Sequence, residues 1–184
     1  LVNPPSKAES VRVRYINLGY DRNIKTLDMN GLRFENVQWN SATKSFQPNA
    51  DSAFLKVFYN GSIEFELEQQ VKFLRNTNYT FISLTRHLCP EINNCKTDTI
   101  IALRTTAALP DNPNYALVKF VNAFPDTNFR YFLRLGCPSG ENLFPSTNYL
   151  QYSLNPALMK SGETSISLIK VPVSGLLSEI VVNV

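Results

Sequence analysis

The sequence predicts an all-β protein built from two tandem antiparallel β-sandwich repeats. Three observations carry this prediction: apolar and polar residues alternate, turn-forming residues separate the alternating segments, and the first part of the chain recurs in the second. In the segment 10–15, Val13 and Tyr15 would face a core while Arg12 and Arg14 face water, as a strand with one buried face requires.

The remaining strand candidates are short and rich in aromatic and β-branched residues. In the first half they are 34–39, 53–59, 63–68, 79–84 and 99–104, and in the second half 116–122, 129–135, 149–154, 165–171 and 179–184. Turn signals such as Asn30-Gly31 and Asn60-Gly61 separate them. No segment keeps a helical period over three turns, and the nearest, 155–160, predicts one turn at most.

An internal duplication relates the two halves. Tyr15-Ile16-Asn17 precedes Phe120-Val121-Asn122 by 105 positions (120 − 15 = 105). The same offset aligns further pairs without a gap: Val13 with Val118, Arg14 with Lys119, Asp21 with Asp126, Asn23 with Asn128, Leu27 with Phe132 and Gly31 with Gly136. Beyond an insertion at about 142–160, the segment 53–58 corresponds to 165–170.

We therefore divide the chain into an N-terminal tail at 1–10, repeat 1 at 11–104, a Pro/Asn-rich linker at 105–115 and repeat 2 at 116–184. The number and spacing of the strands favour an immunoglobulin-like sandwich for each repeat. Repeat 2 lacks equivalents of the last two strands of repeat 1. Either the natural chain continues, or the second copy closes itself with its insertion, or a strand from a partner or a second copy completes the sheet.

Composition limits the classes of function. Hydrophobic residues make up 43% and charged residues 18%, which is typical of a folded chain. The net charge is +3 and the basic residues are scattered singly, so we expect no nucleic-acid partner. No stretch reaches the roughly 20 apolar residues that cross a bilayer. The chain begins without Met or a leader, which indicates a piece of a longer precursor whose signal has been removed.

Two of the three cysteines, Cys89 and Cys95, flank a short loop. They form either a local disulfide, which would fit an oxidising compartment, or two unrelated loop thiols. Cys137 is left unpaired in this scheme. The single histidine, His87, and these cysteines fit no zinc-ligand spacing, so we expect neither a metal nor a cofactor.

The sequence predicts no catalytic residues. Triad chemistry would have to use His87, and no Gly-x-Ser-x-Gly nucleophile motif is present. Glu64, Glu66 and Glu68 are spaced so that a strand would place all three on its outer face, where they keep a sheet soluble. We therefore expect a protein that is not an enzyme.

Four polar residues are candidates for a ligand-binding loop, because they recur at equivalent turns of the two repeats: Asp21, Asn23, Asp126 and Asn128. They could contact calcium or another ligand. The alternative is that these side chains hold the turns by bonding nearby backbone amides. Aromatic residues, at 11%, could likewise stack on sugars, anchor a protein partner or simply fill the cores.

The segment Leu117 to Asp126, which reads LVKFVNAFPD, resembles the opening of repeats in a widespread family of bacterial exported proteins. That opening reads apolar, basic, apolar, apolar, His or Asn, Ala, any residue, Pro, Asp. In repeat 1, the segment 13–17, Asp21 and the turn at 28–31 fit the pattern, whereas Leu18 and Tyr20 stand where Ala and Pro are expected.

The resemblance implies tandem immunoglobulin-like folds, an upstream signal peptide or lipoprotein anchor, and a periplasmic or cell-surface location. It implies no catalytic residues. The layout is also similar to the two-sandwich periplasmic accessory proteins of alginate O-acetylation, a likeness of fold alone. We therefore expect a non-catalytic exported or cell-envelope protein that binds or scaffolds a partner. The alternative is a carbohydrate-binding or accessory protein of a polysaccharide-modifying system.

Overall fold

A computed structural model describes most of the chain, which divides into two compact units, Leu1–Ala107 (unit 1) and Ala108–Val184 (unit 2). The described residues are 11–19, 23–48, 51–87, 96–105, 112–124, 127–137, 139–160, 165–174 and 180–183, with the backbone alone at 85–87, 96–98 and 180–183. These residues contain no helix, and therefore none that is long and apolar enough to cross a membrane.

The first sheet of unit 1 contains a parallel pair of strands. Its members are β1 (Arg12–Asn17), β4 (Ser41–Ala42), β7 (Asn78–His87) and β8 (Lys96–Thr105), in the order β4-β1-β7-β8. β1 and β7 run parallel, whereas the neighbouring pairs are antiparallel. A parallel pair requires a long crossover, and the whole second sheet lies between these two strands in the chain.

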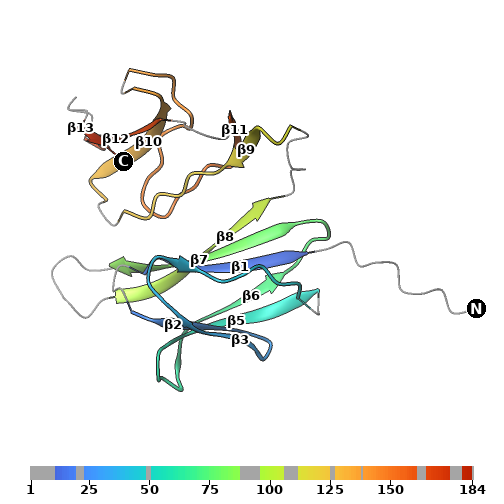
Figure 1. Ribbon diagram of the computed structural model, residues 1–184. Helices are drawn as coiled ribbons and strands as arrows, with labels where there is room; N and C mark the ends of the chain where they lie inside the picture. The colour runs from blue at the N-terminus through green and yellow to red at the C-terminus, as the bar shows by residue number, and fades with distance from the viewer. Residues whose placement is uncertain are drawn as a thin grey trace, which may run out of the picture. The chain divides into compact units, whose positions relative to one another are not determined.

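The second sheet of unit 1 is antiparallel throughout. It consists of β2 (Lys25–Met29), β3 (Leu32–Val37), β5 (Ser52–Tyr59) and β6 (Phe65–Lys72), in the order β3-β2-β5-β6. Asn30 and Gly31 connect β2 to β3 with positive φ angles of 50° and 87°, as a two-residue hairpin turn requires. Figure 1 shows the two sheets of unit 1 as separate layers.

The core of unit 1 lies between these sheets. Val13 and Tyr15 are fully buried while Arg12 and Arg14 are exposed, so the alternation predicted for the first strand is confirmed. The buried cluster draws on both sheets and contains Val13, Tyr15, Leu27, Met29, Val37, Ala53, Leu55, Val57, Val71, Phe73, Tyr79, Phe81 and Ile100. Burial of these apolar side chains is the main stabilising contribution to the sandwich.

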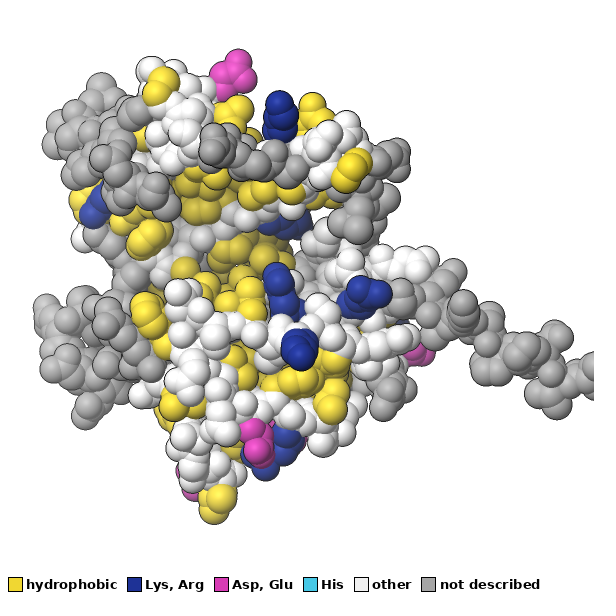
Figure 2. Space-filling model, viewed as in Figure 1, with side chains coloured by type: hydrophobic (Ala, Val, Ile, Leu, Met, Phe, Trp, Pro, Cys, Tyr) yellow, Lys and Arg dark blue, Asp and Glu magenta, His cyan; other side chains and the backbone are white. Residues whose placement is uncertain are grey.

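Unit 2 also has two sheets. One pairs β9 (Tyr115–Val118) with β11 (Ala157–Lys160), and the other has the order β10 (Phe129–Leu135), β12 (Ile166–Pro172), β13 (Ile180–Asn183). The core cluster of unit 2 contains Phe120, Tyr131, Phe144 and Leu168. On the face shown in Figure 2, hydrophobic side chains reach the surface in each unit.

The predicted all-β class is confirmed, and the strands differ from the predicted ones in places. β2 is not among the predicted strands, and its first residue, Lys25, is fully buried. The segment 149–154 forms no strand: it turns at Leu150, and only Tyr152 makes a bridge, to Val121. The segment 155–160, for which at most one helical turn was expected, contains no helix and includes β11 (Ala157–Lys160), which pairs with β9.

The duplication extends to the pairing of the strands. Val37 and Thr147 correspond, because each accepts a hydrogen bond from the buried asparagine of its unit, Asn17 or Asn122. Val37 pairs with Lys25 and Thr147 bridges to Tyr131, so the offset between Lys25 and Tyr131 is 106 (131 − 25 = 106). Tyr131 and Leu133 belong to the cluster around Phe120, and Phe132 between them is buried as well. The pairing with the next strand keeps the gap-free match, because Leu27 pairs with Val57 and Phe132 pairs with Ile169, in line with the correspondence of 53–58 with 165–170. In the described part of unit 2, no strand corresponds to β7 or β8.

Each unit has a completely buried asparagine at or after the end of its first strand and before the next sheet: Asn17 in unit 1 and Asn122 in unit 2. The side-chain oxygens of Asn17 and Asn122 accept the N–H of the residue two positions later, at 3.2 and 3.0 Å. Their side-chain nitrogens donate to the carbonyls of Val37 and Thr147 across the sandwich, at 3.0 and 2.9 Å. This pair of hydrogen bonds ties the two sheets together in each unit.

We predict that Asn17→Ala lowers the free energy of unfolding of unit 1 by about 3 kcal/mol, because buried partners lose their hydrogen bonds at about 1–3 kcal/mol each. Urea unfolding followed by the fluorescence of Trp39, the only tryptophan, measures this change. Arg14→Ala, at an exposed site on the same strand, should change stability by less than about 0.5 kcal/mol. Equal effects of the two substitutions would contradict the prediction.

Candidate binding site

The structure describes two of the four residues predicted for a ligand loop. Asn23 and Asn128 are exposed, and their backbone carbonyls accept hydrogen bonds from the Asn17 side chain and the Val173 N–H, both at 2.8 Å. Asp21 and Asp126 lie outside the described residues, as do Cys89 and Cys95 with their predicted disulfide. The ligand loop and the disulfide stay predictions.

Acidic residues form no cluster suited to chemistry in the described ranges. Glu64, Glu66 and Glu68 are all exposed, and Glu68 pairs with Lys56 of the neighbouring strand at 3.3 Å. No group of three or more His, Cys, Asp or Glu residues that could hold a metal ion occurs in the part of the chain that the structure describes.

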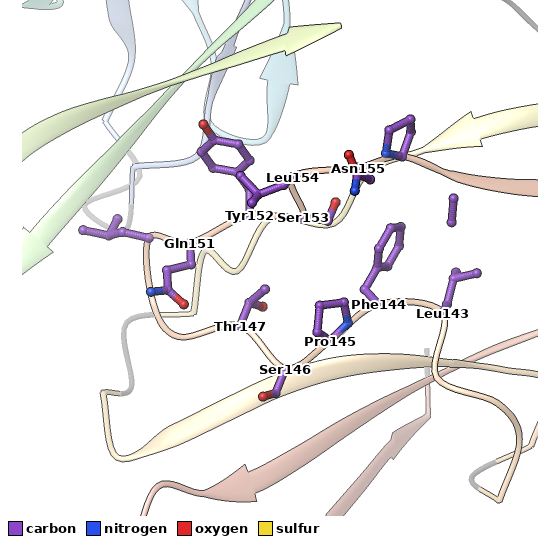
Figure 3. Close-up of a pocket in the computed structure, with 13 residues that line it drawn as sticks. Leu143, Phe144, Pro145, Ser146, Thr147, Gln151, Tyr152, Ser153, Leu154 and Asn155 are labelled. Atoms are coloured by element: carbon purple, nitrogen blue, oxygen red, sulfur yellow. The ribbon is translucent and has the colours of Figure 1, made fainter. Parts of the chain in front are cut away.

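A pocket in unit 2 is the strongest candidate site. It has a volume of about 820 Å³ and is lined by two facing segments, 143–147 and 150–157. Figure 3 shows the ring of Phe144 pointing from one segment toward the other, which carries Tyr152, Leu154 and Asn155. The volume falls in the range of small-ligand pockets. None of the lining residues is Asp, Glu, His, Lys, Arg or Cys.

Several polar groups in the pocket lining are already used by the fold. The Thr147 hydroxyl donates to the carbonyl of Tyr131 at 3.2 Å, and the Ser153 hydroxyl accepts the N–H of Phe120 at 3.0 Å. The Gln151 side-chain oxygen accepts the N–H of Asn148 at 3.0 Å. The lining is mainly apolar and carries no charged side chain, so the pocket suits a neutral ligand.

In the described part of unit 1, an aromatic pair occupies the corresponding place. Phe46 forms a backbone bridge with Val13, and its ring packs on Phe34 with 4.2 Å between the ring centroids. In unit 2 the counterpart of Val13 is Val118, and the residue that pairs with it is Ala157. The pocket thus lies where the second copy carries a methyl group instead of a phenyl ring.

The pocket also contains a strained residue. Five described residues other than glycine have positive φ; four are asparagines, and the fifth is Leu150 at 66°. The N–H of Leu150 donates to the carbonyl of Asn122, just as the N–H of Asn40, with φ 56°, donates to the carbonyl of Asn17. Leucine tolerates this conformation poorly, whereas asparagine adopts it readily. The second copy therefore holds an apolar side chain in the pocket at a cost in stability.

Sequence reasoning missed this pocket because almost all of it falls in the insertion that interrupts the duplication. The signal lay in two comparisons that require the strand register, namely Ala157 with Phe46 and Leu150 with Asn40. Neither comparison follows from a constant offset along the sequence.

Other surface features have simpler explanations. Phe54, Phe58 and Phe65 on the outer side of the second sheet of unit 1 are partly covered by charged side chains, since Arg33 lies over Phe58 and Lys56 over Phe65. Such contacts keep an exposed sheet face soluble.

No protein-family model matches the chain, and no curated protein matches it either. The family resemblance of the opening motif therefore stays a proposal.

We predict that Leu150→Asn raises the free energy of unfolding of unit 2 by about 1 kcal/mol, because it relieves the left-handed strain on leucine. The matched substitution in unit 1, Asn40→Leu, should lower stability by a similar amount. Urea unfolding followed by circular dichroism, together with Trp39 fluorescence for unit 1, measures both changes. A neutral or destabilising Leu150→Asn would show that the conformation is not strained.

Cys137 is an exposed free thiol whose sulfur lies 3.1 Å from the hydroxyl oxygen of Ser139. Hydrogen bonds from the side chain and backbone of Ser139 lower the pKa of the thiol below its ordinary value. Because the thiolate is the reactive form, we predict that Ser139→Ala raises this pKa and slows alkylation of Cys137 by iodoacetamide at neutral pH by a few-fold. Peptide-resolved mass spectrometry measures the rate, and an unchanged rate would refute the assignment.

Proposed function

We propose that the chain is a non-catalytic exported or cell-envelope protein that acts as a binding or scaffolding module, built on tandem immunoglobulin-like sandwiches. The observation that carries the binding role is the pocket of unit 2, which is open, neutral and mainly apolar. Such a surface can hold a partner, and its lining has no Asp, Glu, His, Lys or Cys side chain that could act as a base beside its hydroxyl groups.

The immunoglobulin-like and exported character of this proposal draws on the repeated opening motif. Val13-Arg14-Tyr15-Ile16-Asn17 and Val118-Lys119-Phe120-Val121-Asn122 carry the same pattern of apolar, basic and amide residues. Two-sheet sandwiches support this character at the level of architecture. Export by a signal peptide or lipoprotein anchor, and a periplasmic or surface location, follow from the resemblance and are part of the proposal.

A second candidate function is carbohydrate binding, alone or as an accessory to a polysaccharide-modifying system. The aromatic rings of Phe144 and Tyr152 line the pocket together with the amides of Gln151 and Asn155. Aromatic faces beside amide groups are suited to sugar rings.

A glycan array and site-specific photo-crosslinking of the intact chain separate these functions. A diazirine residue at position 154, where Leu154 is 81% exposed at the pocket, should capture a discrete protein partner, whereas one at position 63 in unit 1, where Ile63 is 94% exposed, should not. The captured protein must then bind the purified chain saturably. Equal capture at both positions would contradict a binding role for the pocket, and selective saturable glycan binding would favour the second function.

A further inference from the structure

We propose that the pocket of unit 2 receives an aromatic side chain from a protein partner, which takes the place that the Phe46 ring occupies in unit 1. This inference rests on the proposed binding function and specifies the chemistry that the pocket recognises. It follows from a comparison of two copies of one sandwich within a single chain.

The first step is the equivalence of Phe46 and Ala157. Phe46 exchanges backbone hydrogen bonds with Val13, at 2.9 Å from its N–H and 2.8 Å to its carbonyl. Ala157 stands opposite Val118 in the β9–β11 pair, and Val118 aligns with Val13 at the same 105-residue offset as the buried asparagines (118 − 13 = 105). The two residues thus occupy the same position on the same edge of the sandwich.

The second step is the aromatic ring that remains in unit 2. Phe34 precedes Val37 by three positions, and Phe144 likewise precedes Thr147, the counterpart of Val37. In unit 1 Phe34 packs on Phe46. In unit 2 Phe144 stacks on Phe120 with 6.3 Å between the centroids, and it also lines the pocket. Phe144 is itself only 4% exposed, so its ring forms part of the pocket wall rather than an open aromatic face.

The third step concerns the ligand class. A charged group would lie against a neutral, mainly apolar lining and would lose its hydration without a partner. A sugar would need several hydrogen-bond partners; the hydroxyls of Thr147 and Ser153 and the oxygen of Gln151 already serve the fold, which leaves the side chains of Ser146, Tyr152 and Asn155. An aromatic side chain needs only apolar contact, which Leu143, Leu150 and Ala157 of the lining supply.

The surroundings of the pocket favour a polypeptide as the source of that side chain. Leu154 is 81% exposed beside the pocket, and Leu150 is held there in a strained conformation. An aromatic anchor that enters a pocket and is ringed by further apolar contacts is the arrangement found at the centres of protein interfaces.

The test uses N-acetyl-4-fluorophenylalaninamide as the probe and ¹⁹F NMR line broadening as the measurement, on the intact chain. The probe should bind saturably with a Kd on the order of 1 mM, as expected for a ligand of this size in an open pocket. Ala157→Phe supplies the missing ring from the chain itself, so it should weaken binding at least about tenfold.

Phe46→Ala gives the matched reversal. In the Ala157→Phe chain, Phe46→Ala should open the equivalent site in unit 1 and restore probe binding. Circular dichroism and urea unfolding establish that each variant folds. If a variant does not fold, competition decides the question in the wild-type chain: N-acetylphenylalaninamide should displace the probe, and N-acetylalaninamide should not.

Three outcomes would overturn the inference: no binding of the probe at about 10 mM, unchanged binding in folded Ala157→Phe, or displacement of the probe by methyl β-glucoside. The last outcome would assign the site to a sugar. Failure of the inference remains distinct from failure of the proposed function, because photo-crosslinking at position 154 reports a protein partner whatever side chain that partner inserts.

Discussion

The sandwich in each unit depends on one buried asparagine that ties the end of the first strand to the opposite sheet. An apolar residue at Asn17 or Asn122 would suit the surrounding core, but it would leave the carbonyl of Val37 or Thr147 without its donor. Inside a protein such a loss costs more than the hydrogen bond contributes at the surface, because no water replaces the partner. The amide therefore specifies how the two sheets connect, which apolar packing alone does not.

Apart from this shared asparagine, the two units differ in the hydrogen bonds that the neighbouring aromatic residue makes. In unit 1 the hydroxyl of Tyr15 shares a hydrogen bond of 2.8 Å with Ser83 of β7, and Ser83 donates in turn to the Asn17 side chain at 3.4 Å. Unit 2 has Phe120 in place of Tyr15, and its ring stacks on Phe144 instead. The network of unit 1 thus extends to a strand that has no counterpart in the described part of unit 2, and the loss of the hydroxyl is consistent with that difference.

Local patterns predicted what depends on neighbouring residues. The alternation in β1, the Asn30-Gly31 hairpin and the strand at 129–135 follow from side-chain periodicity and turn chemistry. β2 could not be predicted in this way, since a buried lysine breaks the apolar pattern. The pocket could not be predicted either: it depends on which residue pairs with Val118 across about 40 positions of chain, and a local insertion hides that register.

The coincidence of two differences at one place is the strongest argument that the pocket has a role. Leu150 replaces an asparagine that the backbone conformation favours, and Ala157 replaces a ring that would fill the space beside Phe144. We expect each difference alone to lower stability by roughly 1 kcal/mol or more, which is substantial for domains that are only marginally stable. Unrelated losses would be expected at scattered positions. Here both differences line the same pocket, and together they make it open and apolar. This is the result expected if a binding surface is retained at the expense of stability.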